Sequence, residues 1–274
     1  MPFRLGLGLF LFLLAGLARA SAVAHQPHIV LELVSQTSTL RPGQAVTLGF
    51  HYQIEPGWHL YWQNPGDSGL APSFTFTLPE GYSAGPVLWP RPQRLASPGL
   101  VDYGYRNDAL FMVPIQVPAN AHPGELVTFS AMARWLVCDE ICIPGRAALE
   151  LKLVVKKKVP GPSKNAKLFT LAAQALPKPW PGGWKAQGTL DAKAFHLAFA
   201  TPDKPTQALF FPLHPNQIDN AAPQEYRFSS HVVHLDLKRS DQLVSGVQTL
   251  EGLLVLKSKK GSKSYSISLP LSSR

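Results

Sequence analysis

Short apolar segments closed by turn-forming residues recur about every ten residues along this chain, and this pattern limits its fold more than any other feature. The clearest segments in the first half are 29–34, 45–54, 110–117, 126–137 and 147–155. The chain has 26 prolines and 21 glycines, although 45% of its residues are hydrophobic. Because so many breakers in an apolar chain favour short strands over long helices, we predict a β-sandwich.

A second group of strand-like segments follows a basic stretch that contains proline and glycine. This stretch, 158–167, is predicted to be a linker, and residues 168–176 a short helix. Later strand-like segments are 195–200, 207–211, 231–237, 250–257 and 264–271. The chain is therefore predicted to be all-β, with a sandwich domain over 25–157 and a second, smaller, sandwich-like β domain over 168–274.

The first 20 residues have the pattern of an export signal. Arg4 precedes an apolar run over 5–17, and Ala18-Arg19-Ala20 fits the small-x-small cleavage pattern. Cleavage as late as residue 24 also fits. A membrane-spanning helix needs about 20 apolar residues, so an uncleaved anchor is the less favoured alternative. We expect an exported protein that is soluble after cleavage.

The formal net charge of +9 comes from 26 Lys+Arg against 17 Asp+Glu. An exported basic protein can approach an anionic membrane surface or an acidic partner. Export also takes the chain away from nucleic acid, so we expect no nucleic-acid partner.

The chain has only two cysteines, Cys138 and Cys142, and they lie four residues apart. On one extended strand their Cα atoms would be about 13 Å apart, whereas a disulfide needs roughly 4.4–6.8 Å. The backbone must therefore fold back between them. A hairpin with Asp139-Glu140-Ile141 at its tip would do this, and so would one helical turn.

The same spacing bears on whether a disulfide here is structural or reactive. Closing a loop of about five residues stabilises a protein by only about 2 kcal/mol, so a purely structural role is weakly motivated. The charges of Asp139 and Glu140 would disfavour a neighbouring thiolate. We therefore expect a pair that is attacked by the thiolate of a partner protein. A non-redox binding module with a structural disulfide is the alternative.

Four blocks in chain order carry a resemblance to a known family. They are 58–69 (WHLYWQNPGDSG), 89–92 (WPRP), 103–105 (YGY) and 135–144 (WLVCDEICIP). With them, residues from about 50 to 155 resemble the N-terminal periplasmic domain of the DsbD-type thiol:disulfide interchange proteins, most closely their ScsB-like branch. The resemblance implies an immunoglobulin-like sandwich in which Cys138 and Cys142 are the redox-active pair.

The resemblance also implies a function and partners. In the family, this domain takes electrons from a membrane-embedded partner domain and passes them to exported thioredoxin-like proteins. Full-length members continue into a membrane domain and a thioredoxin-like domain, whereas this chain stops at Arg274. We therefore expect a stand-alone periplasmic thiol:disulfide oxidoreductase without a cofactor, whose DsbD- or ScsB-like donor acts in trans.

The family has a cap loop that shields the cysteine pair from unwanted oxidation. By order along the chain, residues 102–105 fall where that loop should be, so Tyr103 or Tyr105 could place a ring over the sulfurs. Packing of both rings inside the sandwich is the alternative. Trp58, Trp62 and Trp135 are expected to shape the docking surface or the core beneath it.

Copper is the metal to consider for this chain, because the ScsB-like branch is associated with copper tolerance. His25 and His28 lie near the expected new amino terminus, and His231 lies three residues before His234. On a strand the last two imidazoles would point to opposite faces, however. We therefore predict no metal site, and keep a copper-binding protein as an alternative function.

Overall fold

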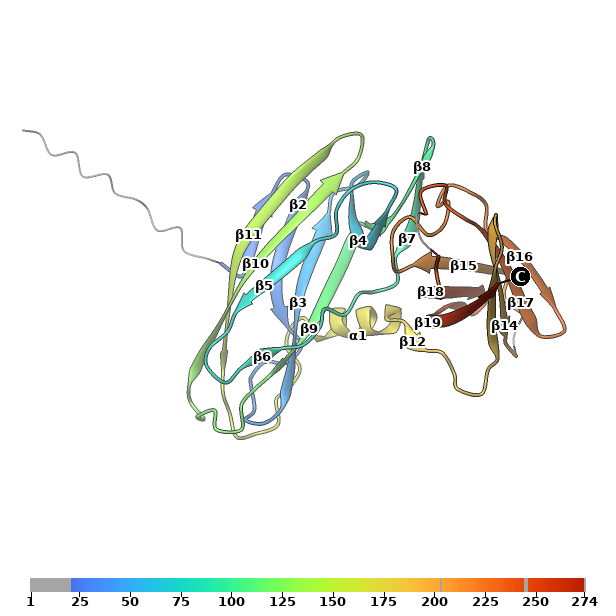
Figure 1. Ribbon diagram of the computed structural model, residues 1–274. Coiled ribbons are helices and arrows are strands. Elements are labelled where there is room, and N and C mark those ends of the chain that lie inside the picture. Colours follow the sequence, from blue (N-terminus) through green and yellow to red (C-terminus); the bar gives the residue numbers. More distant parts are fainter. Residues whose placement is uncertain (1–20, 203, 244–245, 274) are drawn as a thin grey trace, which may run out of the picture.

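The computed structural model describes residues 21–202, 204–243 and 246–273, so the expected export signal at 1–20 lies outside the described residues. Within them the chain is built from strands and one helix, α1 (Ala166–Ala175). The described helix is too short to cross a membrane. Figure 1 shows two β bodies, with α1 below the gap between their ribbons. The all-β prediction is confirmed. We call residues 21–155 the first domain and residues 178–273 the second domain.

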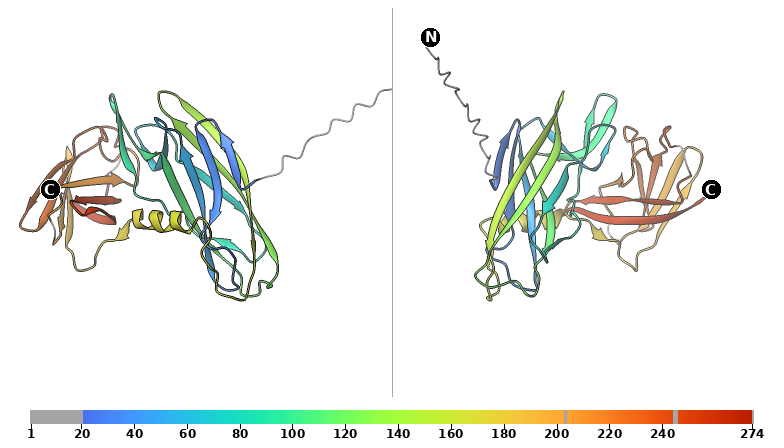
Figure 2. Two further views of the ribbon diagram at one scale, coloured as in Figure 1. Left: turned by 180° about the vertical axis from the view of Figure 1, so that it is seen from behind. Right: turned by 60° about the vertical axis from the view of Figure 1, so that its left-hand side comes forward.

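Two antiparallel sheets form the first domain. One sheet has the order β1 (Val23–Gln26), β2 (Ile29–Ser35), β3 (Ala45–Ile54), β9 (Asp108–Gln116) and β6 (Ser83–Ala84). The other has the order β11 (Cys142–Val154), β10 (Leu126–Cys138), β4 (His59–Gly66), β8 (Leu100–Arg106) and β7 (Gln93–Ser97), and β5 (Ser73–Thr77) pairs with β10. Figure 2 shows them face to face, as a sandwich requires.

The core of the first domain follows from the two-residue period of its strands. Along β10, the alternate residues that point inward are buried: Val127, Phe129, Ala131, Ala133, Trp135 and Val137. Aromatic rings fill the space between the sheets. The ring of Tyr52, for example, packs edge-on against Phe111 and Trp135, with centroids 5.7 and 5.4 Å away. The outward residues of β10, among them Cys138, therefore lie on the other face of its sheet.

One sheet with a core of its own makes up the second domain. Its order is β15 (Gln207–Pro212), β18 (Thr249–Ser258), β19 (Gly261–Ser273), β13 (Ala186–Leu190), β14 (Ala194–Ala200), β17 (Val232–Lys238) and β16 (Glu225–Ser229), and β12 (Lys178–Pro179) pairs with β19. Its buried centre includes Phe195, Phe199, Leu235 and Leu254. Phe211 instead joins the core of the first domain, where its ring packs edge-on against Trp62 and Tyr103.

The segment between the domains is attached to the first one. Within the predicted linker, the carbonyl of Gly161 accepts a hydrogen bond from the backbone of Ser38, and the backbone of Ser163 donates to the carbonyl of Gln36. Helix α1 buries Phe169 against a cluster that includes Leu110. The predicted helix therefore exists, and it packs on the first domain rather than on the second.

Candidate redox site

The cysteine pair closes the long hairpin of β10 and β11. The two strands pair without interruption from Leu126 opposite Val154 to Cys138 opposite Cys142, and the cysteines form a disulfide with Cα atoms 4.2 Å apart. The backbone of Asp139 donates a hydrogen bond of 3.1 Å to the carbonyl of Ile141 within the turn. Of the two arrangements left open by the spacing, the structure has the hairpin.

The two sulfur-bearing residues differ in exposure. Cys138 is 1% exposed, whereas Cys142 lies on the surface. The turn residues Asp139 and Glu140 are exposed as well, and Ile141 exposes 65% of its surface. A partner protein that approaches this end of the hairpin therefore meets Cys142, while Cys138 lies behind it.

Strand β4 supplies the neighbours of the disulfide. His59 is the register partner of Cys138, so the two side chains share one face of the sheet. Tyr61, two residues further, lies on the same face, and its hydroxyl oxygen is 3.7 Å from Sγ of Cys142. The rings of His59 and Tyr61 meet edge-on, with centroids 5.1 Å apart. Both residues are buried.

The loop after β4 covers Tyr61. Gly69 has a φ of +76°, and a Cβ there would lie 2.0 Å from the Tyr61 ring, so only glycine lets the loop rest on that ring. Ser68 fixes the loop from below, because its backbone N–H and its hydroxyl both donate to the carboxylate of Asp102 at 2.9 Å. Asp102 is itself buried, on β8. The PGDSG motif thus builds one wall of the site.

Burial favours the neutral forms of His59 and Tyr61, the two β4 side chains beside the disulfide. Burial lowers the pKa of His59, and the nearby charges oppose one another, since Asp102 and Asp139 raise that pKa while Arg106 lowers it. Nε2 of His59 lies 3.8 Å from Oδ2 of Asp102. Burial also raises the pKa of Tyr61 above its usual value. At neutral pH the disulfide therefore has two uncharged side chains of β4 beside it, His59 and Tyr61.

The two tyrosines predicted for the cap have other contacts. Tyr103 is fully buried, and its hydroxyl donates to Oδ1 of Asn220 at 2.7 Å. Tyr105 is 5% exposed, and its hydroxyl donates to the carbonyl of Pro90 at 2.8 Å. A shielding role for either stays a prediction. The tyrosine whose hydroxyl contacts a sulfur atom is Tyr61, which sequence reasoning missed. Its signal was its place in the WHLYW block.

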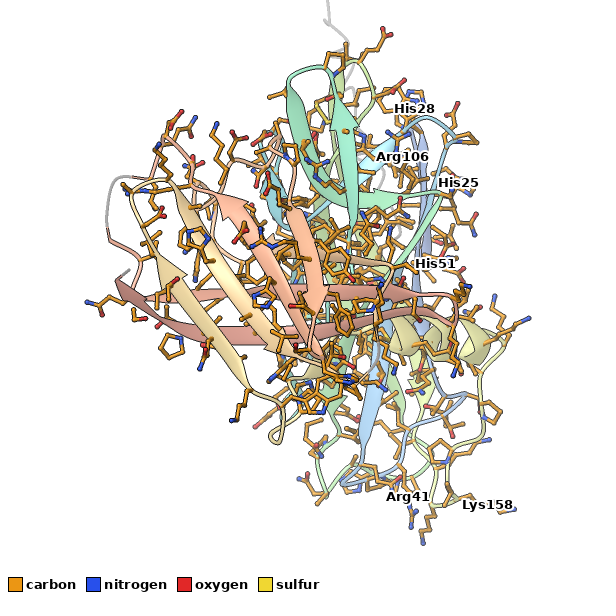
Figure 3. All side chains as sticks on the ribbon, turned by 90° about the vertical axis from the view of Figure 1, so that its right-hand side faces the viewer. His25, His28, Arg41, His51, Arg106 and Lys158 are labelled. Carbon is orange, nitrogen blue, oxygen red and sulfur yellow. A yellow bond between two sulfur atoms is a disulfide. The ribbon has the colours of Figure 1, made fainter. Side chains whose placement is uncertain are left out.

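The three tryptophans divide between core and surface. Trp62 and Trp135 are buried in the core of the first domain. Trp58 is half-buried, and the ring of His28 stacks on it with centroids 3.7 Å apart. Figure 3 places His28 and Arg106 at one end of the first domain, with Arg41 and Lys158 at the other end. Arg106 pairs with His59 in register, so the disulfide lies at the first of these ends.

Among residues 21–202, 204–243 and 246–273, no group of three or more His, Cys, Asp or Glu side chains could hold a metal ion. His231 lies in the turn before β17 and His234 within that strand.

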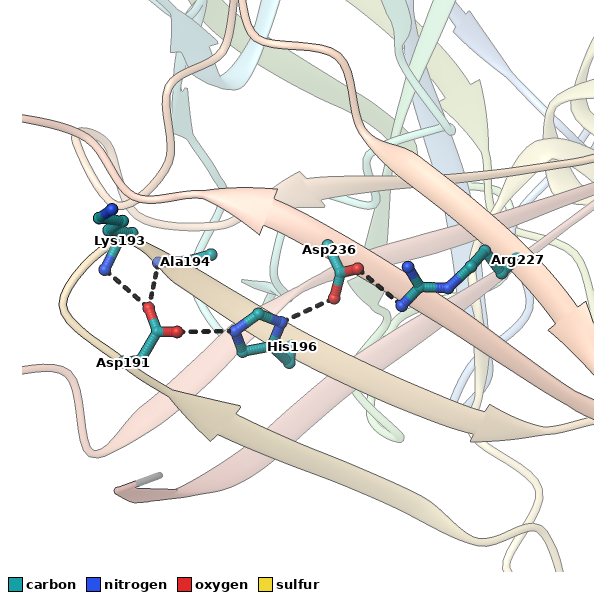
Figure 4. A network of polar contacts seen from close by, with 6 residues as sticks. All are labelled: Asp191, Lys193, Ala194, His196, Arg227 and Asp236. Carbon is teal, nitrogen blue, oxygen red and sulfur yellow. Dashed lines mark hydrogen bonds and ion pairs between the residues drawn. The ribbon is translucent and has the colours of Figure 1, made fainter.

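A second histidine cluster lies in the second domain (Figure 4). Nδ1 of His196 lies 2.7 Å from Asp236, and Nε2 lies 3.0 Å from Asp191. Asp236 also accepts a hydrogen bond from Arg227. The hydrogen bonds to Asp191 and Asp236 raise the pKa of His196. Because both ring nitrogens are occupied, this cluster serves to hold strands together.

Comparison with known proteins covers both domains. A family described as "Thiol:disulfide interchange protein DsbD, N-terminal" matches residues 30–153, which include both cysteines. The N-terminal periplasmic domain of ScsB from Proteus mirabilis has a similar structure, with a TM-score of 0.67 and 16% identity over 91% of this chain and 98% of that one. At this identity the likeness shows a shared fold, and it confirms the predicted fold class.

Two further solved structures have much lower TM-scores. A protein of unknown function from Porphyromonas gingivalis W83 has a TM-score of 0.26 and 10% identity over 88% of this chain and 99% of that one. A tandem pair of titin immunoglobulin domains has a TM-score of 0.21 and 12% identity over 89% of this chain and 97% of that one. No curated protein matches the chain.

Proposed function

Residues 30–153 form a domain of the DsbD N-terminal type, and from this premise we propose that the protein is a periplasmic thiol-disulfide exchange protein. Its exchanging group is the Cys138–Cys142 disulfide. Its donor is a membrane-embedded DsbD- or ScsB-like protein, and its acceptors are exported thioredoxin-like proteins.

The observation that carries the proposal is the unequal exposure of the two cysteines. Cys142 lies on the surface at the end of the hairpin, and Cys138 is buried directly behind it. A thiolate can attack a disulfide only where it can reach a sulfur atom. The hairpin is already held by a continuous ladder from residue 126 to residue 154, to which so short a covalent loop adds only about 2 kcal/mol. Reactivity therefore explains the pair better than stability.

The exchange proceeds in two displacements. The donor thiolate attacks Sγ of Cys142, which gives a mixed disulfide and releases the sulfur of Cys138. The second thiolate of the donor then attacks the donor sulfur of the mixed disulfide and releases Cys142 as a thiolate. Two electrons have moved to the cysteine pair, and the donor has become the disulfide. The reduced pair reverses these steps on the disulfide of an acceptor.

Exposed apolar side chains near the pair supply a surface for a partner. Ile141, between the cysteines, is 65% exposed, and Leu70, next to the glycine that rests on Tyr61, is 68% exposed. Large apolar side chains at the centre of an interface dominate its binding energy. Together with Trp58 they would form the contact around Cys142.

The reduction potential of the pair tests the proposal. The purified protein is equilibrated with glutathione buffers, and its thiols are counted. An exchange protein should have a potential within roughly −120 to −270 mV. A pair that stays oxidised below about −300 mV would be a structural disulfide, and the protein would then be a binding module.

A further inference from the structure

His59 is a buried histidine whose ring makes no hydrogen bond. It is 7% exposed, and neither Nδ1 nor Nε2 has a hydrogen-bond partner among the described residues. Buried polar side chains are satisfied in the large majority of cases, because leaving one unsatisfied costs about 1–3 kcal/mol. The exchange mechanism described above does not use this imidazole. The position of His59 in the sheet suggests a role for it in that mechanism.

Strand pairing places His59 beside the buried sulfur. It lies directly opposite Cys138 in the pairing of β4 with β10. Opposite residues of an antiparallel pair have Cβ atoms about 4.5–5.5 Å apart on the same face. Tyr61, on that same face, contacts the exposed sulfur of Cys142. The two side chains of β4 thus lie on the face of the disulfide, Tyr61 in contact with the exposed Cys142 and His59 directly opposite the buried Cys138.

Three charged groups act on this imidazole. Asp102 on β8 lies 3.8 Å from Nε2, and Asp139 belongs to the turn between the cysteines. Arg106 on β8 is the register partner of His59 on the side away from Cys138. Burial keeps the imidazole neutral at neutral pH, so that it can accept a proton. Asp102, held by Ser68, would stabilise the imidazolium that forms.

We propose that His59 is the base that takes the proton of the Cys138 thiol when the reduced protein passes its electrons to an acceptor disulfide. This inference rests on the proposed function. The arrangement of thiol, imidazole and carboxylate follows the general logic of an activated nucleophile, in which a base is in turn oriented by an acid.

The step occurs after the acceptor has bound covalently. The thiolate of Cys142 attacks one acceptor sulfur, forms a mixed disulfide and releases the other acceptor sulfur as a thiolate. His59 then accepts the proton of Cys138, and the new thiolate attacks Sγ of Cys142. The Cys138–Cys142 bond forms, the mixed disulfide breaks, and the second acceptor thiolate leaves. The imidazolium gives this proton to the second acceptor thiolate, and the first acceptor thiolate takes its proton from the solvent, which received that of Cys142. Two electrons and two protons therefore reach the acceptor.

The experiment separates the two displacements. The reduced protein is mixed with dithiobis-nitrobenzoate, a disulfide that releases a coloured thiolate in each displacement. The first, bimolecular phase reports attack by Cys142. The second, unimolecular phase reports attack by Cys138. Both phases are recorded between about pH 5.5 and pH 9, for the wild type, for His59→Gln and for His51→Gln. His51 is a matched control, because it is also buried but lies on β3 and bonds with Asp108.

We expect the substitution His59→Gln to slow the second phase about 10- to 100-fold at pH 7, since a general base contributes at least this much. The first phase should change less than about twofold, and His51→Gln should leave both phases unchanged. In the wild type, the second phase should rise through a midpoint below the usual imidazole value of about 6.5 and then stay level to about pH 8. In His59→Gln it should rise tenfold per pH unit through that range.

The outcomes distinguish the inference from the proposed function. If the wild type releases both coloured thiolates and His59→Gln has the same second phase and pH profile, His59 is not the base, while exchange stands. If the wild type releases only one coloured thiolate, the cysteine pair does not exchange, and the proposed function fails. Should His59→Gln not fold, the wild-type profile still decides: a second phase that climbs steadily between about pH 6.5 and 8 rules out a neutral histidine base.

Discussion

The hydroxyl of Tyr103 in the first domain donates a hydrogen bond of 2.7 Å to Oδ1 of Asn220 in the second. The side-chain NH2 group of Asn220 in turn donates to Asp67 at 2.8 Å, and the backbone carbonyl of Asn220 accepts from Arg94 at 2.6 Å. Asp67 precedes Ser68 in the loop that covers Tyr61. One residue of the second domain therefore holds both the strand and the loop that enclose the redox site, which gives this domain a role in shaping it.

Asn220→Ala tests this coupling between the domains. The substitution leaves the buried Tyr103 hydroxyl without its acceptor and frees Asp67 from the second domain. We expect the free energy of unfolding in urea to fall by about 1–3 kcal/mol. We also expect dithiothreitol to reduce the Cys138–Cys142 disulfide faster, since the covering loop loses a support.

Asn120→Ala is the matched control, because Asn120 lies in an exposed turn of the first domain. It should leave both the stability and the reduction rate close to the wild type. Equal effects of the two substitutions would show that the Asn220 contacts do not support the redox site.

The hairpin could be predicted from sequence because it is local. Only three residues separate Cys138 from Cys142, and the distance that a disulfide spans leaves few ways to join them. The contact of Tyr61 with Cys142 could not be predicted in this way, since it joins residues 81 positions apart through the pairing of β4 with β10. The register between strands that are distant in sequence is set by tertiary packing, and the local sequence pattern does not predict it.

For the same reason, the sequence could not predict where the side chains of the two expected cap tyrosines point. Order along the chain placed Tyr103 and Tyr105 near the cysteines, and β8 does lie beside β4. Whether their side chains face the sulfurs depends on the face of the sheet and on a partner in another domain. The hydroxyl of Tyr103 finds its acceptor, Asn220, 117 residues away. No motif in the sequence marks that asparagine.

Gly69→Ala tests whether the covering loop shields the disulfide. A methyl group at this position would lie 2.0 Å from the ring of Tyr61, far inside van der Waals contact, so the loop or the ring must move. We expect the free energy of unfolding to fall by the cost of a left-handed alanine plus about 1–3 kcal/mol for this clash. The displaced ring should also expose the disulfide, and its reduction by dithiothreitol should become several-fold faster.

Gly99→Ala separates this clash from backbone strain. Gly99 has nearly the same φ, +77° against +76° for Gly69, yet a Cβ there would meet nothing within 4 Å. Its substitution should cost only the strain of a left-handed alanine, about 1–2 kcal/mol, without a change in reduction rate. If both variants are reduced at the same rate, the loop does not shield the sulfurs.

The order of attack follows from exposure and is tested with single cysteines. The Cys138→Ser protein keeps the exposed Cys142, so it should form a mixed disulfide with glutathione disulfide, seen as added mass. The Cys142→Ser protein keeps the buried Cys138 and should react at least about tenfold more slowly, because access limits thiol exchange. In denaturant the two proteins should react alike. A folded Cys142→Ser protein that reacts as fast as Cys138→Ser would contradict this order.

The histidine cluster of the second domain predicts how stability depends on pH. The pKa of His196 is raised in the folded protein by its hydrogen bonds to Asp191 and Asp236, so its stabilisation is complete below the unfolded value of about 6.5 and is lost as the pH rises through the folded value. The pKa of Asp191 is lowered, so its stabilisation is present above about pH 3.9 and is lost as the pH falls. The cluster should therefore stabilise most between about pH 4 and 6.5.

His196→Gln removes the titrating partner and should make this window visible. The difference in free energy of unfolding between wild type and variant, measured in urea, should be largest near pH 5.5 and shrink steadily as the pH rises above about 6.5. His234→Gln, on the neighbouring strand β17 and outside the network of Figure 4, should give a difference that varies much less over this range. An imidazole that is bonded to two carboxylates cannot lose its proton without weakening its contacts with them. If the difference in free energy of unfolding between wild type and His196→Gln is constant from about pH 5 to 8.5, the charge of His196 therefore does not contribute to stability.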